Sequence, residues 1–311
     1  VYGEYVNLRI FRSINAGLHG EYIYSGIDDA GVDANFIAPF ILDPTDPLTI
    51  FAGGRSLWRT TNARAPSPAW TEIFGPGNDR ISAIAVAPTD PDVIWIGLNN
   101  GEIRRTPNGT AITPVWTPVD NNGGLDPLPD RYITRILFDP DDADTVYVSL
   151  GGFEPDNLLR TNDGGATWTD VTGAGPAGLP EVPIRGIARH PNNPDWLYVG
   201  TEVGVFASED GGQSWSTNNF GPASVSVDEL VFLHGSTTLL AATHGRGLFI
   251  IDLGRVADLN GDFVVDGADL FILLGEWGPC PAPCSSCAAD LNDDCAVDSA
   301  DQIGRASCRE R

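Results

Sequence analysis

One eight-residue phrase occurs twice in this chain and constrains its fold more than any other feature. The copies are Thr161–Trp168 and Ser208–Trp215, and both fit Ser/Thr-x-Asp-Gly-Gly-x-Thr/Ser-Trp. Weaker copies end at Trp70 and Trp116, so the closing tryptophans are 46, 52 and 47 residues apart. A blade of four short antiparallel strands needs about 40–50 residues. The repeat therefore predicts a β-propeller built from four-stranded blades.

Each repeat contains four short segments rich in β-branched and aromatic residues, separated by Pro, Gly, Asn and Asp. In one copy they are Ile133–Pro140, Thr145–Leu150, Asn157–Thr161 and Trp168–Val171. Partial copies at 8–17 and 228–252 bring the total to about 5–6 blades, the first of them entered mid-blade. We therefore expect a mainly β propeller domain over residues 1–253, incomplete at its N-terminus.

The repeat resembles the BNR, or Asp-box, repeat of sialidase-like propellers, a group that includes sialidases, sortilin-type receptors and xyloglucan-degrading glycosidases. This fold hosts unrelated activities, so the resemblance implies the fold more than the function. Asp163 and Asp210 have two possible roles, as catalytic carboxylates or as turn residues. We expect the turn role, because an Asp that accepts backbone N–H bonds, glycines with positive φ and a core Trp account for the whole motif.

Chemistry is expected on the long acidic loops of the opposite face, since functional sites often lie on loops held by a rigid scaffold. These loops run over 26–34 with Asp33, over 120–131 and over 173–183, and Glu154 and Asp156 lie in a further loop. A sialidase-like site would need arginines to hold a substrate carboxylate. A paired-carboxylate glycosidase would instead need two opposed acids.

Six residues are candidates for catalysis on these loops or at the starts of the inner strands: Arg80, Arg135, Arg185, Asp126, Asp130 and Glu181. Arg135 and Arg185 differ by one residue in their offset from the following turn proline, so their side chains should face opposite ways. For each candidate, the alternative is an ordinary solvated loop residue.

A pattern of oxygen-bearing side chains occurs twice after Leu253. Loop positions 1, 3, 5, 7, 9 and 12 are Asp258, Asn260, Asp262, Val264, Asp266 and Asp269, then Asp290, Asn292, Asp294, Ala296, Asp298 and Asp301. Position 7 offers its backbone carbonyl, so both sets match an EF-hand calcium loop. A helix should follow the first loop, since Leu270, Leu273, Leu274 and Trp277 have helical spacing. We expect two Ca²⁺ sites.

The duplicated loops resemble a type I dockerin over residues 254–302, with the second helix missing. The resemblance implies a calcium-folded attachment module with a cohesin-like or cell-surface partner. Position 6 of each loop, where Gly normally takes positive φ, is Phe263 or Cys295, which should reduce calcium affinity. Residues 303–311 match the translation of a common sequencing adapter, and we treat them as adapter read-through.

The net charge of −24, with no lysine, argues against nucleic acid and anionic membranes as partners. No apolar run approaches the length of a membrane span. Cys280, Cys284, Cys287 and Cys295 cluster between the calcium loops and predict two disulfides in any of three pairings, with a zinc site as the alternative. Disulfides and dockerin-like loops together indicate a secreted or cell-surface bacterial protein.

The sequence thus predicts a secreted, carbohydrate-associated propeller that acts as a binding module or degenerate glycosidase scaffold. The alternatives are an active glycoside hydrolase, sialidase-like or xyloglucanase-like, and a sortilin-like propeller that binds an extracellular protein. Opposed carboxylates or converging arginines in the central depression of the propeller would favour an enzyme. A depression lined by apolar and amide groups would favour a ligand-binding module.

Overall fold

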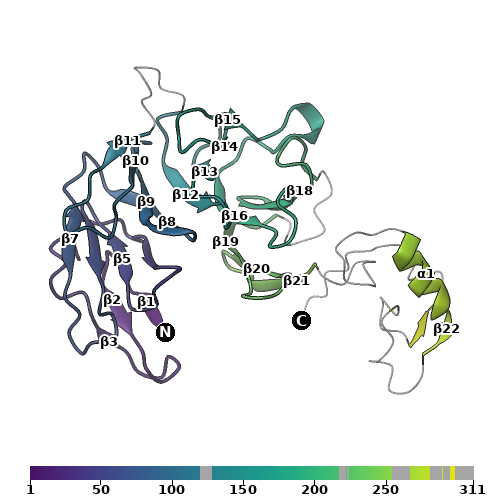
Figure 1. Cartoon of the computed structure of the whole chain (residues 1–311), viewed down its shortest axis with the longest axis horizontal. Coiled ribbons are helices and arrows are strands. Elements are labelled where there is room, and N and C mark those ends of the chain that lie inside the picture. Colours follow the sequence, from purple (N-terminus) through teal and green to yellow (C-terminus); the bar gives the residue numbers. More distant parts are fainter. Residues whose placement is uncertain are drawn as a thin grey trace. The chain divides into compact units, whose positions relative to one another are not determined.

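The computed structural model describes residues 1–119, 128–216, 222, 224–253, 267–280, 289 and 295–297. The chain divides into two compact units, Val1–Gly186 and Ile187–Arg311. Figure 1 labels their strands and helix along the chain. The described residues are mainly in β-strands, and consecutive strands pair antiparallel within each sheet.

The first unit contains one three-stranded and three four-stranded sheets. The three-stranded sheet consists of β1 (Tyr2–Glu4), β2 (Ile10–Arg12) and β3 (Glu21–Tyr22). The next consists of β4 (Phe40–Leu42), β5 (Ile50–Gly53), β6 (Leu57–Thr60) and β7 (Thr71–Phe74). Two more follow: β8 (Ile81–Ala87), β9 (Asp90–Leu98), β10 (Ile103–Thr106) and β11 (Thr117–Pro118), then β12 (Ile133–Phe138), β13 (Val146–Leu150), β14 (Leu158–Thr161) and β15 (Thr169–Asp170).

After the 3₁₀ helix η1 (Gly175–Ala177), strand β16 (Ile184–Arg189) contains the division between the units. The second unit has the hairpin β17 (Leu197–Thr201) and β18 (Gly204–Ser208), and the sheet β19 (Val227–Phe232), β20 (Thr238–Thr243) and β21 (Gly247–Asp252). Helix α1 (Gly267–Gly275) and the pair β22 (Gly278–Pro279) and β23 (Ala296–Val297) follow.

The predicted repeat corresponds to the observed sheets. The four segments expected between 133 and 171 are β12 to β15, and the two preceding repeats form four-stranded sheets of the same order. This arrangement is consistent with a propeller-like fold, and no closed sheet is seen among the described residues. Strand β1, which the sequence reading did not predict, pairs with β2 in the first sheet.

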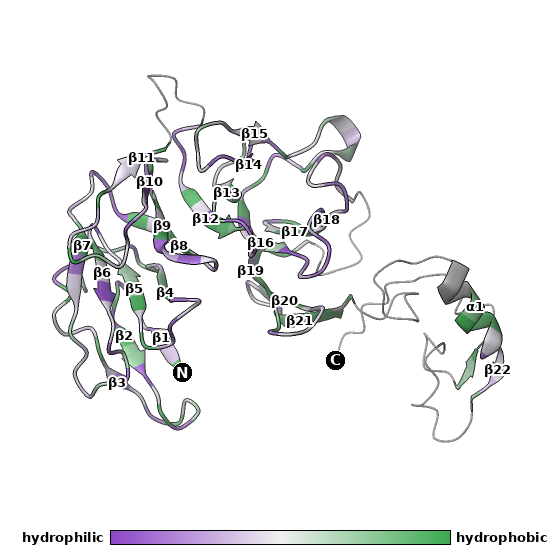
Figure 2. Cartoon of the chain, viewed as in Figure 1, coloured by the Kyte–Doolittle hydropathy of each residue, from purple (hydrophilic) through white to green (hydrophobic). Residues whose placement is uncertain are grey.

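The sheets of the first unit pack through buried apolar strands. Strand β5 is hydrophobic and fully buried, whereas the outer strand β7 begins with two exposed hydrophilic residues, Thr71 and Glu72, before the buried Ile73 (Figure 2). Glycines on the second strands allow the next sheet to approach closely. A Cβ on Gly97 would lie 2.5 Å from Ile133 Cγ2, and one on Gly53 would lie 2.8 Å from Ile81 Cγ2. A larger residue at either position would force the sheets apart.

The tryptophan that closes each repeat also ties it to the preceding sheet. The indole Nε1 of Trp70 donates to Ile23 O at 2.7 Å, and that of Trp116 donates to Ile73 O at 2.8 Å. Trp168 Nε1 lies 3.3 Å from Val119 O and packs edge-on against Trp95. The similar spacing of these tryptophans along this chain thus reflects a contact that is repeated between neighbouring sheets.

Helix α1 lies where the sequence predicted a helix after the first calcium loop, but the predicted apolar face is only partly buried. Leu273 is 5% exposed and packs with Ala289 and Val297. Leu274 and Trp277, expected on the same face, are 53% and 47% exposed. Trp277 lies beyond the last residue of α1, so the helix is shorter than the predicted apolar stripe.

Candidate functional site

The Asp-Gly-Gly turns have the geometry of the turn interpretation. Asp163 Oδ1 accepts the Thr167 backbone N–H at 2.8 Å, and Asp163 Oδ2 accepts the Thr167 hydroxyl at 2.6 Å. Gly164 and Gly165 have φ of +66° and +91°. The Thr167 hydroxyl and backbone N–H lower the pKa of Asp163 to about 2. A carboxylate whose acceptor sites are bound by its own turn is poorly placed for catalysis.

Asp210 makes the same contacts in the second unit. Its carboxylate accepts the Ser214 backbone N–H at 2.8 Å and the Ser214 hydroxyl, and these bonds lower its pKa to about 2. The buried Ser208 hydroxyl donates to Asp210 Oδ1 at 2.8 Å. Both Asp residues therefore belong to the turn, not to a reaction centre.

Asparagine takes the place of aspartate in the weaker repeats. Thr60 donates to Asn62 Oδ1 at 2.8 Å, and Thr106 donates to Asn108 Oδ1 at 2.8 Å. The first partial repeat does the same with Asn15, which accepts the Ser13 hydroxyl at 2.9 Å. The turn thus requires an oxygen acceptor two residues after the hydroxyl, and it does not require a charge.

Arginines on β2, β6 and β10 brace these turns, a role that the sequence analysis did not predict. Arg12 Nη1 donates to the carbonyls of Ala63 and Ala65 at 2.7 and 2.6 Å. Arg59 donates to Gly109 O and Ala111 O in the same way, and Arg105 Nη1 donates to Gly164 O. Each arginine directly precedes the turn hydroxyl of its own strand and reaches the turn of the next repeat. The recurrence of arginine directly before the turn hydroxyl is the sequence pattern that could have indicated this bracing role.

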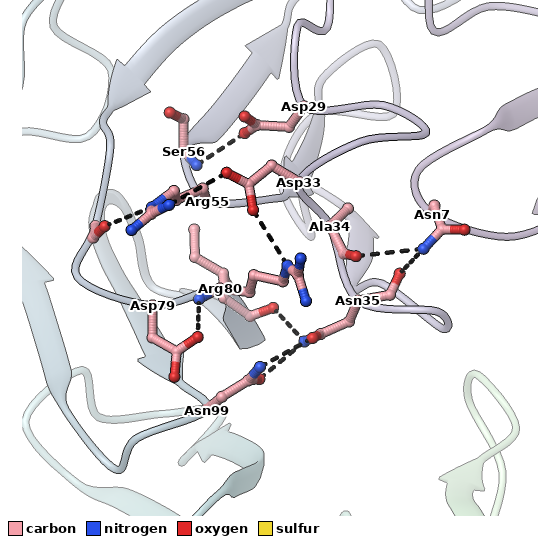
Figure 3. A network of polar contacts seen from close by, with 12 residues as sticks. Asn7, Asp29, Asp33, Ala34, Asn35, Arg55, Ser56, Asp79, Arg80 and Asn99 are labelled. Carbon is pink, nitrogen blue, oxygen red and sulfur yellow. Dashed lines mark hydrogen bonds and ion pairs between the residues drawn. The ribbon is translucent and has the colours of Figure 1, made fainter.

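Arg80, a candidate for catalysis, lies in a polar cluster around Asp33. Asp33 lies between two guanidiniums: its Oδ1 is 3.2 Å from Arg80 Nε and its Oδ2 is 3.4 Å from Arg55 Nη1 (Figure 3). All three side chains are 36–45% exposed. Asp33 and Arg80 therefore compensate each other's charge and tie the loop 26–35 to the start of β8.

An amide pair completes this cluster. The side chains of Asn35 and Asn99 bond to each other at 2.9 Å in both directions, and Asn35 Nδ2 also donates to Ile81 O at 3.0 Å (Figure 3). Asp29 Oδ2 accepts the Ser56 backbone N–H at 2.8 Å. Asp29 and Asp33 of the first loop thus have structural partners.

The first unit contains an open cleft of about 430 Å³. It is lined by Arg131, Tyr132, Thr134, Gly151, Gly152, Glu154, Pro183 and Arg185. These residues come from the start of β12, the β13–β14 loop and the start of β16. We call this hollow the Arg131 cleft.

Arg131 holds the β13–β14 loop in place. Its Nη1 donates to Asn157 Oδ1 at 2.6 Å, and its Nη2 donates to Pro155 O at 2.7 Å and Asp156 O at 3.2 Å. Glu154 Oε2 lies 3.6 Å from Arg131 Nη1, and the Glu154 side chain is 70% exposed. Glu154 is thus a solvent-facing carboxylate beside a fixed guanidinium.

The lining of the Arg131 cleft also contains a hydroxyl, a phenol and a second guanidinium. The extra residue at the bulge of β12 is Thr134, and its hydroxyl is 2.7 Å from that of Ser149. Burial raises the pKa of the Tyr132 phenol, and the positive charge of Arg185 partly opposes that shift. The phenol is therefore protonated at neutral pH and can donate a hydrogen bond.

The six residues that the sequence offered as candidates for catalysis do not lie together in one site. Arg185 lines the Arg131 cleft, and Arg135 is not part of its lining. Arg80 belongs to the Asp33 cluster. Asp130 and Glu181 are exposed and lie outside the cleft lining, and Asp126 lies outside the described residues. Tyr132, Thr134 and the two glycines of the cleft were not among the sequence candidates.

Most of the predicted calcium ligands lie outside the described residues. Only Asp269, in α1, and Ala296, in β23, fall within elements of the structure. The described part of the chain contains no cluster of three or more side chains of metal-ligating type. Cys295, at position 6 of the second loop, has a φ of +71°, the conformation for which Gly is usual there. Cys280 and Cys295 are both disulfide-bonded.

No family model matches the chain. It is 30% identical over 152 residues to a probable oligoxyloglucan-reducing end-specific xyloglucanase of Neosartorya fischeri, covering 42% of this chain and 17% of that protein. It is 26% identical over 215 residues to an oligoxyloglucan-reducing end-specific xyloglucanase of Emericella nidulans, covering 63% and 25%. The chain therefore spans a quarter or less of the length of these relatives.

Among solved structures, the chain is similar to an ancestral GH74 enzyme, with a TM-score of 0.57 and 19% identity over 81% of this chain and 34% of that one. The extracellular domain of a hybrid two-component system of B. thetaiotaomicron gives a TM-score of 0.55 at 18% identity, over 78% of this chain and 29% of the other. Within the described ranges, no helix is long and apolar enough to traverse a bilayer. The chain is thus similar in sequence to xyloglucanases and similar in fold to a GH74 enzyme.

Proposed function

We propose that this chain is a propeller segment of a secreted glycoside hydrolase that acts on xyloglucan. The observation that carries the proposal is the Arg131 cleft, a hollow on the strand-connecting loops that contains the exposed Glu154 carboxylate. The similarity to xyloglucanases of two fungi supports the substrate class. This reading replaces the binding module as our preferred function.

Glu154 is the acid we assign to catalysis in this proposal. Glycoside hydrolysis generally uses two carboxylates, about 5–5.5 Å apart in retaining enzymes and about 6.5–9.5 Å apart in inverting ones. Glu154 supplies one of them from the β13–β14 loop, and its partner would face it across bound glycan. Arg131 would act as a positioning residue, because its bonds to the loop fix the backbone that carries Glu154.

A second candidate function is xyloglucan binding without hydrolysis. The observation that favours it is that Glu154 is the single carboxylate on the described lining of the Arg131 cleft. Guanidiniums, a phenol and hydroxyls can all bond to sugar hydroxyls without a second acid.

Release of new reducing ends from xyloglucan tests these alternatives. We expect activity in the wild type and a loss of about 100-fold or more in Glu154→Gln, since removing a catalytic carboxylate has effects of that order. Glu21→Gln, at an exposed acid outside the cleft lining, is the matched control. Binding of xyloglucan without any reducing ends would support the second candidate, and the absence of both would refute the proposal.

We also propose that residues 258–269 and 290–301 bind two Ca²⁺ ions and form an attachment module. The donors would be the carboxylate, amide and carbonyl oxygens named above, which are the hard ligands that Ca²⁺ prefers. The start of α1 at Gly267, within the first loop's final turn, and the positive φ of Cys295 support the loop geometry.

A further inference from the structure

A buried histidine closes the turn that follows strand β16. His190 comes directly after β16 and is 2% exposed. Its ring packs edge-on against Trp196 and Phe232, with ring centroids 5.2 and 5.5 Å away. Its Nδ1 accepts the backbone N–H of Asn192 at 3.2 Å and that of Asn193 at 3.1 Å. An imidazole nitrogen that accepts these bonds carries no proton, so the ring is neutral, with its proton on Nε2.

Aspartate takes the same place in two other repeats. After β4, Asp43 Oδ1 accepts the backbone N–H of Thr45 at 2.8 Å and that of Asp46 at 3.2 Å. After β12, Asp139 Oδ1 accepts the backbone N–H of Asp141 at 2.9 Å. A carboxylate ordinarily titrates near pH 4, whereas an imidazole ordinarily titrates near about pH 6.5. The histidine therefore makes its turn sensitive to weak acid, in a pH range where a carboxylate still accepts hydrogen bonds.

The connection between β16 and β17 also supports the Asp-Gly-Gly turn of the same repeat. The backbone N–H of His190 donates to Trp196 O at 2.9 Å and closes this connection. Within it, Asp195 O accepts the backbone N–H of Gly211 at 2.9 Å. Gly211 belongs to the turn 208–215. Opening of the connection would therefore remove a hydrogen bond from that turn.

Burial, and not a neighbouring charge, decides the charge state of His190. Burial lowers its pKa below the ordinary value, and no charged group offsets that shift. Arg189 Nε donates to Pro194 O at 3.2 Å, and burial raises the pKa of the Tyr198 phenol, which is therefore neutral. Among the described residues, the charged and titratable side chains on the surrounding elements are Arg189 and Asp195 beside His190, Tyr198 on β17, Glu209 after β18, and Asp228, Glu229 and His234 on or just after β19.

We propose that His190 is an acid-sensitive latch on the connection between β16 and β17. A proton from solvent adds to the Nδ1 lone pair, and the new N–H then faces two N–H donors, so both hydrogen bonds break. The charged ring leaves its apolar position between Trp196 and Phe232, and the connection 190–196 opens. The latch lies in the second unit and involves no glycan, so it is independent of the proposed function.

The lowered pKa of His190 gives the direction of the pH response. In the opened chain a histidine titrates near its ordinary value of about 6.5. Above that pH both states are neutral and the latch is closed. As the pH falls below about 6.5, the opened state takes up a proton that the closed state resists. The ratio of closed to opened states therefore falls by up to about 10-fold per pH unit, until the pH reaches the folded-state pKa.

Hydrogen–deuterium exchange of the full chain at about pH 7.5 and about pH 5 tests the latch, once the rates are corrected for the intrinsic pH dependence of amide exchange. We expect protection of residues 190–196 to fall about 10-fold at the lower pH, with a smaller fall in 208–215. The turn 43–49, which Asp43 holds with a carboxylate, is the internal control and should not change. Equal protection of 190–196 at both pH values would overturn the proposal.

Two variants assign the response to this residue. His190→Asn keeps an acceptor oxygen and takes up no proton, so its protection should be the same at both pH values. His234→Asn removes an exposed histidine after β19 and should respond as the wild type does. A response that persists in His190→Asn, or that is lost in His234→Asn, would overturn the assignment to His190.

Nitrogen NMR of the wild type gives a second test that needs no substitution, because the smaller Asn leaves space beside Trp196. We expect the His190 ring to carry its proton on Nε2 at about pH 7.5, with Nδ1 unprotonated. A protonated Nδ1 at that pH would mean that it does not accept the two backbone bonds, and it would overturn the proposal.

Discussion

At the scale of single residues, the repeated turns of this chain show that the same hydrogen-bonded turn can be built with either aspartate or asparagine. Asp163 and Asn108 each accept a hydrogen bond from the hydroxyl two residues earlier, at 2.8 Å in both cases. Each also accepts a backbone N–H further along its turn, from Thr167 or Val115, again at 2.8 Å. The charge of the aspartate therefore adds strength to bonds that the amide already makes.

This equivalence predicts the effect of substitution at position 163. Asp163→Asn should fold with nearly unchanged stability at pH 7, because Asn already serves this turn elsewhere in the chain. Asp163→Ala should lose about 1 kcal/mol, the low end for bonds to a charged group, since the site is exposed. Denaturant unfolding of both variants measures the difference, and equal losses in the two would contradict the assigned role.

The lowered pKa values of Asp163 and Asp210 predict an acid-dependent loss of stability. Each carboxylate has a folded-state pKa of about 2, below its value in the unfolded chain. Their contribution is therefore complete above about pH 4 and is lost as the pH falls towards 2. The melting temperature of a double Asn variant, measured between these pH values, should depend less on pH than that of the wild type. An unchanged pH dependence would assign acid unfolding to other groups.

The arginine braces give a prediction at the same scale. Arg105→Met keeps most of the aliphatic stem and removes the bond to Gly164 O, so it should cost about 2 kcal/mol of unfolding free energy. The neighbouring Arg104 instead pairs with Glu102, and Arg104→Met should cost about 1 kcal/mol or less. Denaturant titrations of the two variants measure these losses of unfolding free energy. Equal losses would show that the bond from Arg105 to the turn does not stabilise the fold.

At the scale of strands and sheets, glycines on the second strands set how closely neighbouring sheets approach. Gly97→Ala would place its Cβ against the branched side chain of Ile133, and it should cost about 1–3 kcal/mol by overpacking. Gly151→Ala is the matched control, because its nearest contacts would be 3.5 Å or more. Chemical denaturation distinguishes them, and a neutral Gly97→Ala would mean that the sheets can move apart at little cost.

Much of this architecture could be predicted from the sequence, because a repeat shows the same local pattern several times. The four strands of one blade were visible in the segments between 133 and 171, and the turn role of Asp163 followed from its neighbours. The position of Arg105 before the turn hydroxyl is a signal for its role, but its partner could not be predicted, since Gly164 lies 59 positions along the chain. Arg185 was a candidate by position, but its place in the same cleft lining as Arg131 depends on how successive strands pack.

At the scale of the whole molecule, the C-terminal calcium loops are predicted to fold independently of the sheets. Chelator added to the full chain should remove the far-UV circular dichroism of α1, because the ligand loops supply most of the folding energy of such a module. The main thermal transition of the β-sheets should be unchanged. Helicity that persists at saturating chelator would contradict calcium binding by residues 258–269 and 290–301.

We propose above all that this chain binds xyloglucan in the Arg131 cleft. Hydrogen–deuterium exchange of the full chain, with and without a xyloglucan oligosaccharide, tests it by location. We expect slower exchange in peptides 128–134 and 151–157, and no change in 161–168, whose turn is saturated by its own side chains. Protection confined to the turn peptides, or absent throughout at saturating oligosaccharide, would contradict the account.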